Sequence, residues 1–183
     1  MPHPAPPSGG GISKAEGAFL WAEGEQESGN NYSAVNQSSG ALGRWQVMPA
    51  NVAPWTRQAV GRTLTPDQFL NSHTAQDDVA VTILGGYFLT YGAAGAAAMW
   101  YSGQPDPTKT YGNPPVYQYV NDVLALMRHA PGGAGLNLSP YEPVTTPPPD
   151  SMTSWAPKVR ASAGHLSATA AELLTAAAAI RRL

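Results

Sequence analysis

The sequence predicts an all-α domain with a loose segment at each end, and three observations support this fold class. Apolar residues recur at helical spacing in several stretches between residues 14 and 129. Helix-start signals precede these stretches, and glycine follows several of them. No stretch has the alternation of apolar and polar residues that is typical of a strand. We therefore expect helices that pack on one another without a sheet.

The first helix is predicted by signals at both of its ends. Ser13 is a good N-cap, and Glu16 stands three residues later, where it completes a capping box. The helix should run to Glu27 or Ser28 and stop at Gly29, a residue suited to the position after a helix. Residues 30–44 are rich in Asn, Ser and Gly and are expected to form a loop.

The middle of the chain contains further helix signals. Residues 49–60 fit a short helix, in which Pro54 favours a break. Thr65-Pro66-Asp67 is a strong helix start, and Ser72 begins another helix that should end near Gly92.

Two more helices complete the expected domain. Residues 93–101 predict a second, alanine-rich helix, and residues 103–115 a turn-rich loop. Residues 116–129 predict a helix with one apolar side, formed by Val116, Tyr119, Val120, Val123, Leu124 and Met127.

The unevenly placed prolines divide the 183 residues into four parts. We expect a flexible segment at 1–12, the globular domain at 13–129, a Gly- and Pro-rich linker at 130–154 and a separate helix at 155–183. Apolar residues in the last part follow a heptad seam, which a single helix cannot bury. That helix must fold back on the domain, pair with a copy of itself or dock on another protein.

The composition argues against several classes of function. Only 12% of residues are charged, the net charge is −2 and Lys and Arg form no run, so a nucleic-acid partner is not expected. There is no cysteine, and the four histidines are far apart in sequence, so we expect no metal site and no cofactor. Residues 1–12 do not have the pattern of a signal peptide. Glycines interrupt the most apolar stretch, 79–99, which favours buried helices over membrane insertion.

Two blocks at a fixed spacing carry the most specific signal. Glu27-Ser28-Gly29 ends the first helix, and Ser39-Gly-Ala-Leu-Gly-Arg-Trp-Gln-Val-Met-Pro49 follows about ten residues later. Together they resemble the catalytic region of soluble lytic transglycosylases, which cleave peptidoglycan glycan strands and are relatives of goose-type lysozyme. The resemblance covers about residues 14–128 and implies a lysozyme-like fold.

Two later segments extend this resemblance. Trp100-Tyr101-Ser102-Gly103 stands where the family has a Tyr-Asn-Ala-Gly-like element, and Tyr119-Val120 matches a later Tyr-Val pair. Two departures are informative. Tyr101 replaces the usual Asn, which puts a substrate-facing amide in doubt. Arg44-Trp45 replaces a small or apolar pair and is expected to alter the groove floor.

Glu27 is the candidate catalytic residue. Cleaving a glycosidic bond requires a proton on the departing oxygen, and a carboxylic acid kept neutral near pH 7 supplies it. Burial raises the pKa of such a group, and Glu23, four residues earlier on the same helix face, would push it the same way. Taken alone, Glu27 is better explained as a solvated carboxylate at a helix end; the second sequence block is what favours catalysis.

The resemblance implies that one carboxyl group suffices. The C6 hydroxyl of the sugar attacks the anomeric carbon of the MurNAc-β-1,4-GlcNAc bond, which gives a 1,6-anhydro product. A tethered nucleophile has a high effective molarity, about 10⁵ M or more. If a second carboxylate faces Glu27, hydrolysis as in goose-type muramidases is the alternative; the candidates are Glu23, Glu25, Asp67, Asp77 and Asp78. A non-catalytic assembly module with a lysozyme-like shape is another.

The resemblance also implies substrate-binding positions. Gln46 would bond sugar groups, Met48 would pack against the N-acetyl group, and Ser39 would orient the acid or hold a water. Ordinary turn packing explains the same residues. Tyr119 would bond Glu27 from the last helix, although a Tyr on an apolar face is as often core.

Aromatic side chains are candidates for stacking on sugar rings. Trp100 and Tyr101 are the first choice, with core packing as the other interpretation of Trp100. Trp45, Trp55 and Tyr32 are weaker candidates.

The expected partner is therefore the glycan strand of peptidoglycan. A wall-cleaving domain with a Pro-rich tether and a seam-bearing helix suits a bacteriophage virion, as a tail-associated lysin that meets other virion proteins or itself through residues 155–183.

Overall fold

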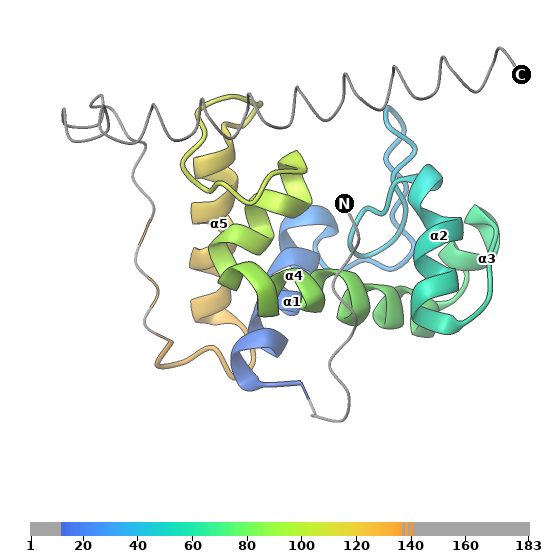
Figure 1. Cartoon of the computed structure of the whole chain (residues 1–183), viewed down its shortest axis with the longest axis horizontal. Helices are drawn as coiled ribbons and strands as arrows, with labels where there is room; N and C mark the ends of the chain where they lie inside the picture. Colours follow the sequence, from blue (N-terminus) through green and yellow to red (C-terminus); the bar gives the residue numbers. More distant parts are fainter. Residues whose placement is uncertain (1–11, 137, 139, 141–183) are drawn as a thin grey trace, which may run out of the picture. The chain divides into compact units, whose positions relative to one another are not determined.

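The computed structural model describes residues 12–136, 138 and 140, all of which belong to the compact unit Met1–Pro143 (Figure 1). It contains five helices, which are α1 (Lys14–Ser28), α2 (Pro49–Val60), α3 (Pro66–Leu70), α4 (His73–Ser102) and α5 (Val116–His129). Within the described residues, strand-like pairing is limited to the isolated bridges of Leu42 with Val35 and Val47. The all-α prediction is confirmed. The segment 1–11, most of the predicted linker and the helix predicted at 155–183 lie outside the described residues.

Both ends of α1 lie where the sequence predicts, but of the predicted capping box the structure shows only the half made by the Ser13 side chain. The Ser13 hydroxyl accepts a hydrogen bond from the Glu16 backbone N–H at 3.1 Å, so it caps the first turn. Gly29 has a φ of 63° and its N–H bonds the Glu25 carbonyl, which ends the helix. Glu27 is therefore held in the last turn of a helix whose two ends are both set by local sequence.

The predicted break in α2 is wrong, because the helix continues through Pro54. A proline at this position removes the N–H that would bond the Ala50 carbonyl. Ala50 and Pro54 are both exposed, so water can replace the missing donor at this turn. The missing hydrogen bond is therefore on the solvent-exposed side of α2, and the helix tolerates the proline.

The start signals of α3 and α4 are confirmed. The Thr65 hydroxyl accepts from the Gln68 N–H while the Gln68 amide accepts from the Thr65 N–H, which is a complete capping box. The Ser72 hydroxyl accepts from the Ala75 N–H and begins α4.

The long helix α4 consists of two helices, as the glycine at its centre predicts. Gly92 has a φ of 69° and a ψ of 177°, which no α-helix contains, so the chain changes direction there. By length and composition α4 is able to cross a membrane, but more than half of its most apolar window is buried in the domain. That burial is typical of a core helix.

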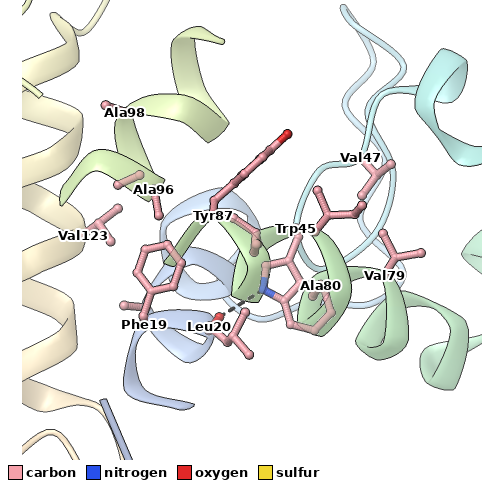
Figure 2. Packing of buried hydrophobic residues seen from close by; sticks show 14 of the residues in the cluster. Phe19, Leu20, Trp45, Val47, Val79, Ala80, Tyr87, Ala96, Ala98 and Val123 are labelled. Atoms are coloured by element: carbon pink, nitrogen blue, oxygen red, sulfur yellow. Dashed lines mark hydrogen bonds between the residues drawn. The ribbon is translucent and has the colours of Figure 1, made fainter. Parts of the chain in front are cut away.

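Helix α4 is the centre of the domain, because it packs against each of the other four helices. Helix α1 also packs against α5; in the view of Figure 1, α5 lies to the left of α1, and α2 and α3 lie to the right. Phe19 of α1, Val123 of α5 and Ala96 of α4 belong to one buried hydrophobic cluster (Figure 2). This packing brings the start of α5 against the last turns of α1, although the two are distant in sequence.

Candidate active site

A pocket of about 270 Å³ lies at the end of α1. Its walls come from the loop after α1, the first half of α2 and the end of α4; the lining residues are Glu27, Asn36, Ser39, Ala41, Gln46, Val47, Met48, Asn51, Trp55, Trp100 and Tyr101. Glu27 is the one carboxyl group among them. The arrangement therefore presents one acid surrounded by amide, thioether and aromatic groups.

Glu27 is partly buried, and two side chains interact with its carboxyl group. The Tyr119 hydroxyl lies 2.6 Å from Glu27 Oε1, and the Trp100 side chain is also hydrogen-bonded to the carboxyl. Burial raises the pKa of Glu27, and the hydrogen bonds from Tyr119 and Trp100 lower it by less. The result is a carboxyl group that retains its proton to higher pH than a free Glu, as a general acid requires.

Glu23 lies one turn earlier on α1 and is fully buried. The Tyr119 hydroxyl is 2.7 Å from Glu23 Oε2, and Glu23 Oε1 has no hydrogen-bond partner among the described residues. Burial raises the pKa of Glu23 to about 8; the bond to Tyr119 lowers it, and the nearby charge of Glu27 raises it further. Glu23 is therefore enclosed in the domain and does not line the pocket.

Tyr119 itself is held firmly behind Glu27. Its ring stacks on Tyr101, with the centroids 4.4 Å apart and the planes 13° apart. The Tyr101 hydroxyl donates to the Pro114 carbonyl at 2.8 Å, so this residue cannot swing freely. Tyr101, which replaces the asparagine of the resemblance, thus lines the pocket and also orients the tyrosine that contacts the acid.

A polar network anchors the loop that carries half of the pocket wall. The Ser28 hydroxyl donates to the Arg44 carbonyl at 2.7 Å, and the Arg44 guanidinium donates to Asn30 and to the Tyr32 hydroxyl. The buried Gln76 amide accepts from the Arg44 N–H at 2.9 Å and donates to the Tyr32 carbonyl. Ser28, the residue after Glu27, therefore links the end of α1 to the loop by a hydrogen bond.

The three loop residues that were predicted to contact substrate all line the pocket, but two of their side chains are hydrogen-bonded within the loop and the third, that of Met48, is exposed. Gln46 has a φ of 49°, and its side-chain amide donates to the Gly43 carbonyl at 2.9 Å. Ser39 accepts from the Ala41 N–H at 3.2 Å, which is the turn-packing role that the sequence left open. Met48 is 44% exposed, so its thioether is available to a ligand.

Trp100 and Trp55 form an aromatic part of the pocket wall, although the sequence made Trp55 only a weaker candidate for stacking on sugar rings. Trp55 lies 5.3 Å from Trp100, centroid to centroid, with a tilt of 35°. Asn36 and Asn51 also line the pocket and were not predicted. The Asn36 side chain accepts hydrogen bonds from the backbone N–H groups of Ser38 and Ser39. An Asn followed by Ser residues predicts a turn, so the sequence did not point to Asn36 as a binding residue.

Other candidates lie away from the pocket. Trp45 is buried, and its indole N–H donates to the Leu20 carbonyl at 3.0 Å (Figure 2), so it is not available for sugar stacking. The Tyr32 ring stacks on His73, and its hydroxyl donates to Asp77. Glu25 accepts from the Asn30 side chain. Asp77 and Glu25 are thus part of the loop network rather than the pocket lining.

The burial of Glu23 predicts how stability depends on pH. Between its ordinary pKa of 4.5 and about 8, folded Glu23 holds a proton that the unfolded chain has released, so stability falls as pH rises. Glu23→Gln is uncharged at every pH and removes this dependence. We expect the free energy of unfolding of the native protein, relative to Glu23→Gln, to fall by up to about 1.4 kcal/mol per pH unit within that window. Urea titrations at several pH values measure it, and two parallel curves would contradict it.

No cluster of His, Asp and Glu that could hold a metal ion occurs in the described residues. Comparison with family models, with curated proteins and with solved structures finds no match for this chain.

Proposed function

We propose that this domain is a lytic transglycosylase with a lysozyme-like fold, which cleaves MurNAc-β-1,4-GlcNAc bonds in peptidoglycan. The single observation that supports it best is the solitary acid of the pocket. Glu27 is partly buried, has a raised pKa and stands among amide and aromatic groups, with no second carboxyl group in the pocket wall. An uncharged glycan fits such a lining, because sugar rings stack on aromatic faces and their hydroxyls bond amides.

The reaction uses Glu27 twice. Its neutral carboxyl first gives a proton to the departing glycosidic oxygen, while the C6 hydroxyl of the same sugar bonds to the anomeric carbon. The carboxylate then accepts the proton of that hydroxyl, so the enzyme returns to its starting state and no water is consumed. Between the two transfers Glu27 is charged, and the hydrogen bonds from Tyr119 and Trp100 stabilise this charge.

The remaining pocket residues have supporting roles in this proposal. Trp100 and Trp55 offer ring faces for a sugar, and Met48 offers a flexible apolar contact for its N-acetyl group. The amides of Gln46, Asn36 and Asn51 are bonding groups for sugar hydroxyls.

Product analysis tests the proposal and separates it from its two alternatives. Purified sacculi incubated with the full chain should release muropeptides that are lighter by one water than hydrolysis products. Reducing-end products would instead identify a goose-type muramidase, which uses a second carboxylate to activate water. Binding to sacculi without any release would identify a non-catalytic module. The lining of the pocket favours the first outcome, since Asp77, Asp78 and Glu25 are not part of it.

The setting proposed for this activity is a bacteriophage virion, in which a tail-associated lysin opens the wall locally. That part of the proposal rests on residues 130–183, whose Pro-rich stretch and heptad seam suit a tether and a docking or self-association helix.

A further inference from the structure

The hydrogen bonds between Glu23, Tyr119 and Glu27 allow their protons to be counted. The Tyr119 oxygen lies 2.7 Å from Glu23 Oε2 and 2.6 Å from Glu27 Oε1. A phenol has one proton and can donate to one of these oxygens only. The other short contact joins two oxygens and needs a proton of its own, which must come from a carboxyl group. These two contacts therefore account for one phenolic and one carboxylic proton, and a proton on the other oxygen of Glu27 is additional to them.

The surroundings decide which carboxyl group supplies that proton. Glu23 is fully buried, and its Oε1 has no partner among the described residues, so an ionised Glu23 would leave a charged oxygen without a donor. Glu27 lines the pocket and has a second hydrogen bond, from Trp100, so it bears a negative charge more easily. The pKa of about 8 for Glu23 agrees with this assignment. The chain of bonds then runs from Glu23 through Tyr119 to Glu27.

We propose that Glu23 is a positioning residue that must be neutral during catalysis. Its Oε2–H donates to the Tyr119 oxygen, so the Tyr119 hydroxyl donates its own proton to Glu27 Oε1. The other oxygen of Glu27 then carries the proton that is given to the substrate. The catalytic consequence rests on the function proposed above, whereas the hydrogen-bond chain does not.

Loss of the Glu23 proton reverses this chain. The phenol then donates to the Glu23 carboxylate, and Glu27 loses the donor that stabilises its charge. A proton that remains on Glu27 is drawn to Oε1, where it donates to the Tyr119 oxygen and points away from the pocket. The active form therefore needs both carboxylic protons, and each ionisation inactivates the site.

Carbon-13 NMR of the glutamate carboxyl groups tests the chain without any substrate. In the full-length protein, with signals assigned from Glu23→Gln and Glu27→Gln, we expect Glu23 to remain protonated at pH 7 and to ionise near pH 8. Ionised Glu23 at pH 7 would overturn the inference, whatever the activity. In Tyr119→Phe the ring is kept and the bond to Glu23 is lost; because that bond lowers the pKa of Glu23, its ionisation should move to higher pH. A shift in the other direction would also overturn it.

The pH profile of the reaction tests the positioning role. Because both protons are needed, the logarithm of kcat in the native enzyme should fall with a slope approaching two at pH values above the pKa of both carboxyl groups, of which that of Glu23 is about 8. In Glu23→Gln, whose amide N–H replaces the donor, the slope should be one. A slope of one in both proteins would mean that Glu23 is only structural. If the NMR results hold and no glycan is cleaved at any pH, the proposed function fails while the hydrogen-bond chain stands.

Discussion

Glu27→Gln is expected to abolish glycan cleavage, with a loss of at least about 10²–10⁴-fold, the contribution of general acid–base catalysis. The amide has the shape of the neutral carboxyl group and still accepts the hydrogen bond from Tyr119, but it cannot give a proton to the departing oxygen. Release of muropeptides from sacculi, measured per unit time at the optimum pH, gives the result. The free energy of unfolding should change little, because the variant removes no packing.

Glu25→Gln is the matched control for this experiment. The same substitution is made two residues away on the same helix, at a carboxyl group that bonds the Asn30 side chain and does not line the pocket. This variant should retain most of the activity. Substantial cleavage by Glu27→Gln, or equal losses in the two variants, would exclude Glu27 as the acid.

Gly43→Ala is expected to destabilise the domain by about 4 kcal/mol. Gly43 has a φ of 71°, and a Cβ there would lie 2.1 Å from Gln76 Oε1 and 2.5 Å from its Cδ. Gln76 cannot move away cheaply, because its amide bonds the Arg44 N–H and the Tyr32 carbonyl in a buried position. Displacing it leaves these groups without partners, in addition to the cost of an alanine in the left-handed region.

Gly61→Ala separates the two costs. Gly61 has a φ of 75°, but nothing lies within 4 Å of a Cβ at that position. Only the backbone term remains, and the expected loss is about 1 kcal/mol. Urea denaturation of both variants at one pH measures the difference. Equal losses would mean that the Gln76 network relaxes freely and does not hold the pocket loop.

The two sequence blocks around Glu27 are connected by this same network. Ser28 bonds the Arg44 carbonyl, and the close approach of Gly43 to Gln76 fastens the loop to α4. The fixed spacing that made the blocks recognisable therefore corresponds to a loop that is closed at both ends by hydrogen bonds. A glycine is required at position 43 because a Cβ there would clash with the Gln76 side chain and because the backbone has a positive φ.

What the sequence determined by itself is the set of helices in the described part of the chain, α1 to α5, and the loop residues Ser39, Gln46 and Met48 as part of the pocket lining. Ser13, Gly29, Thr65 and Gly92 act on the few residues beside them, so their effects could be predicted without knowing the rest of the chain. Pro54 is the exception, since its effect depended on the exposure of Ala50 in the folded domain.

Only the tertiary structure decided the roles of chemically similar residues. Glu23 and Glu27 are one helical turn apart, yet Glu23 is enclosed in the domain and Glu27 lines the pocket. Trp45 enters the core while Trp55 and Trp100 line the pocket. The resemblance to a known family implied the bond between Tyr119 and Glu27, but the second bond of Tyr119, to Glu23, joins residues 96 positions apart and could not be predicted from local sequence.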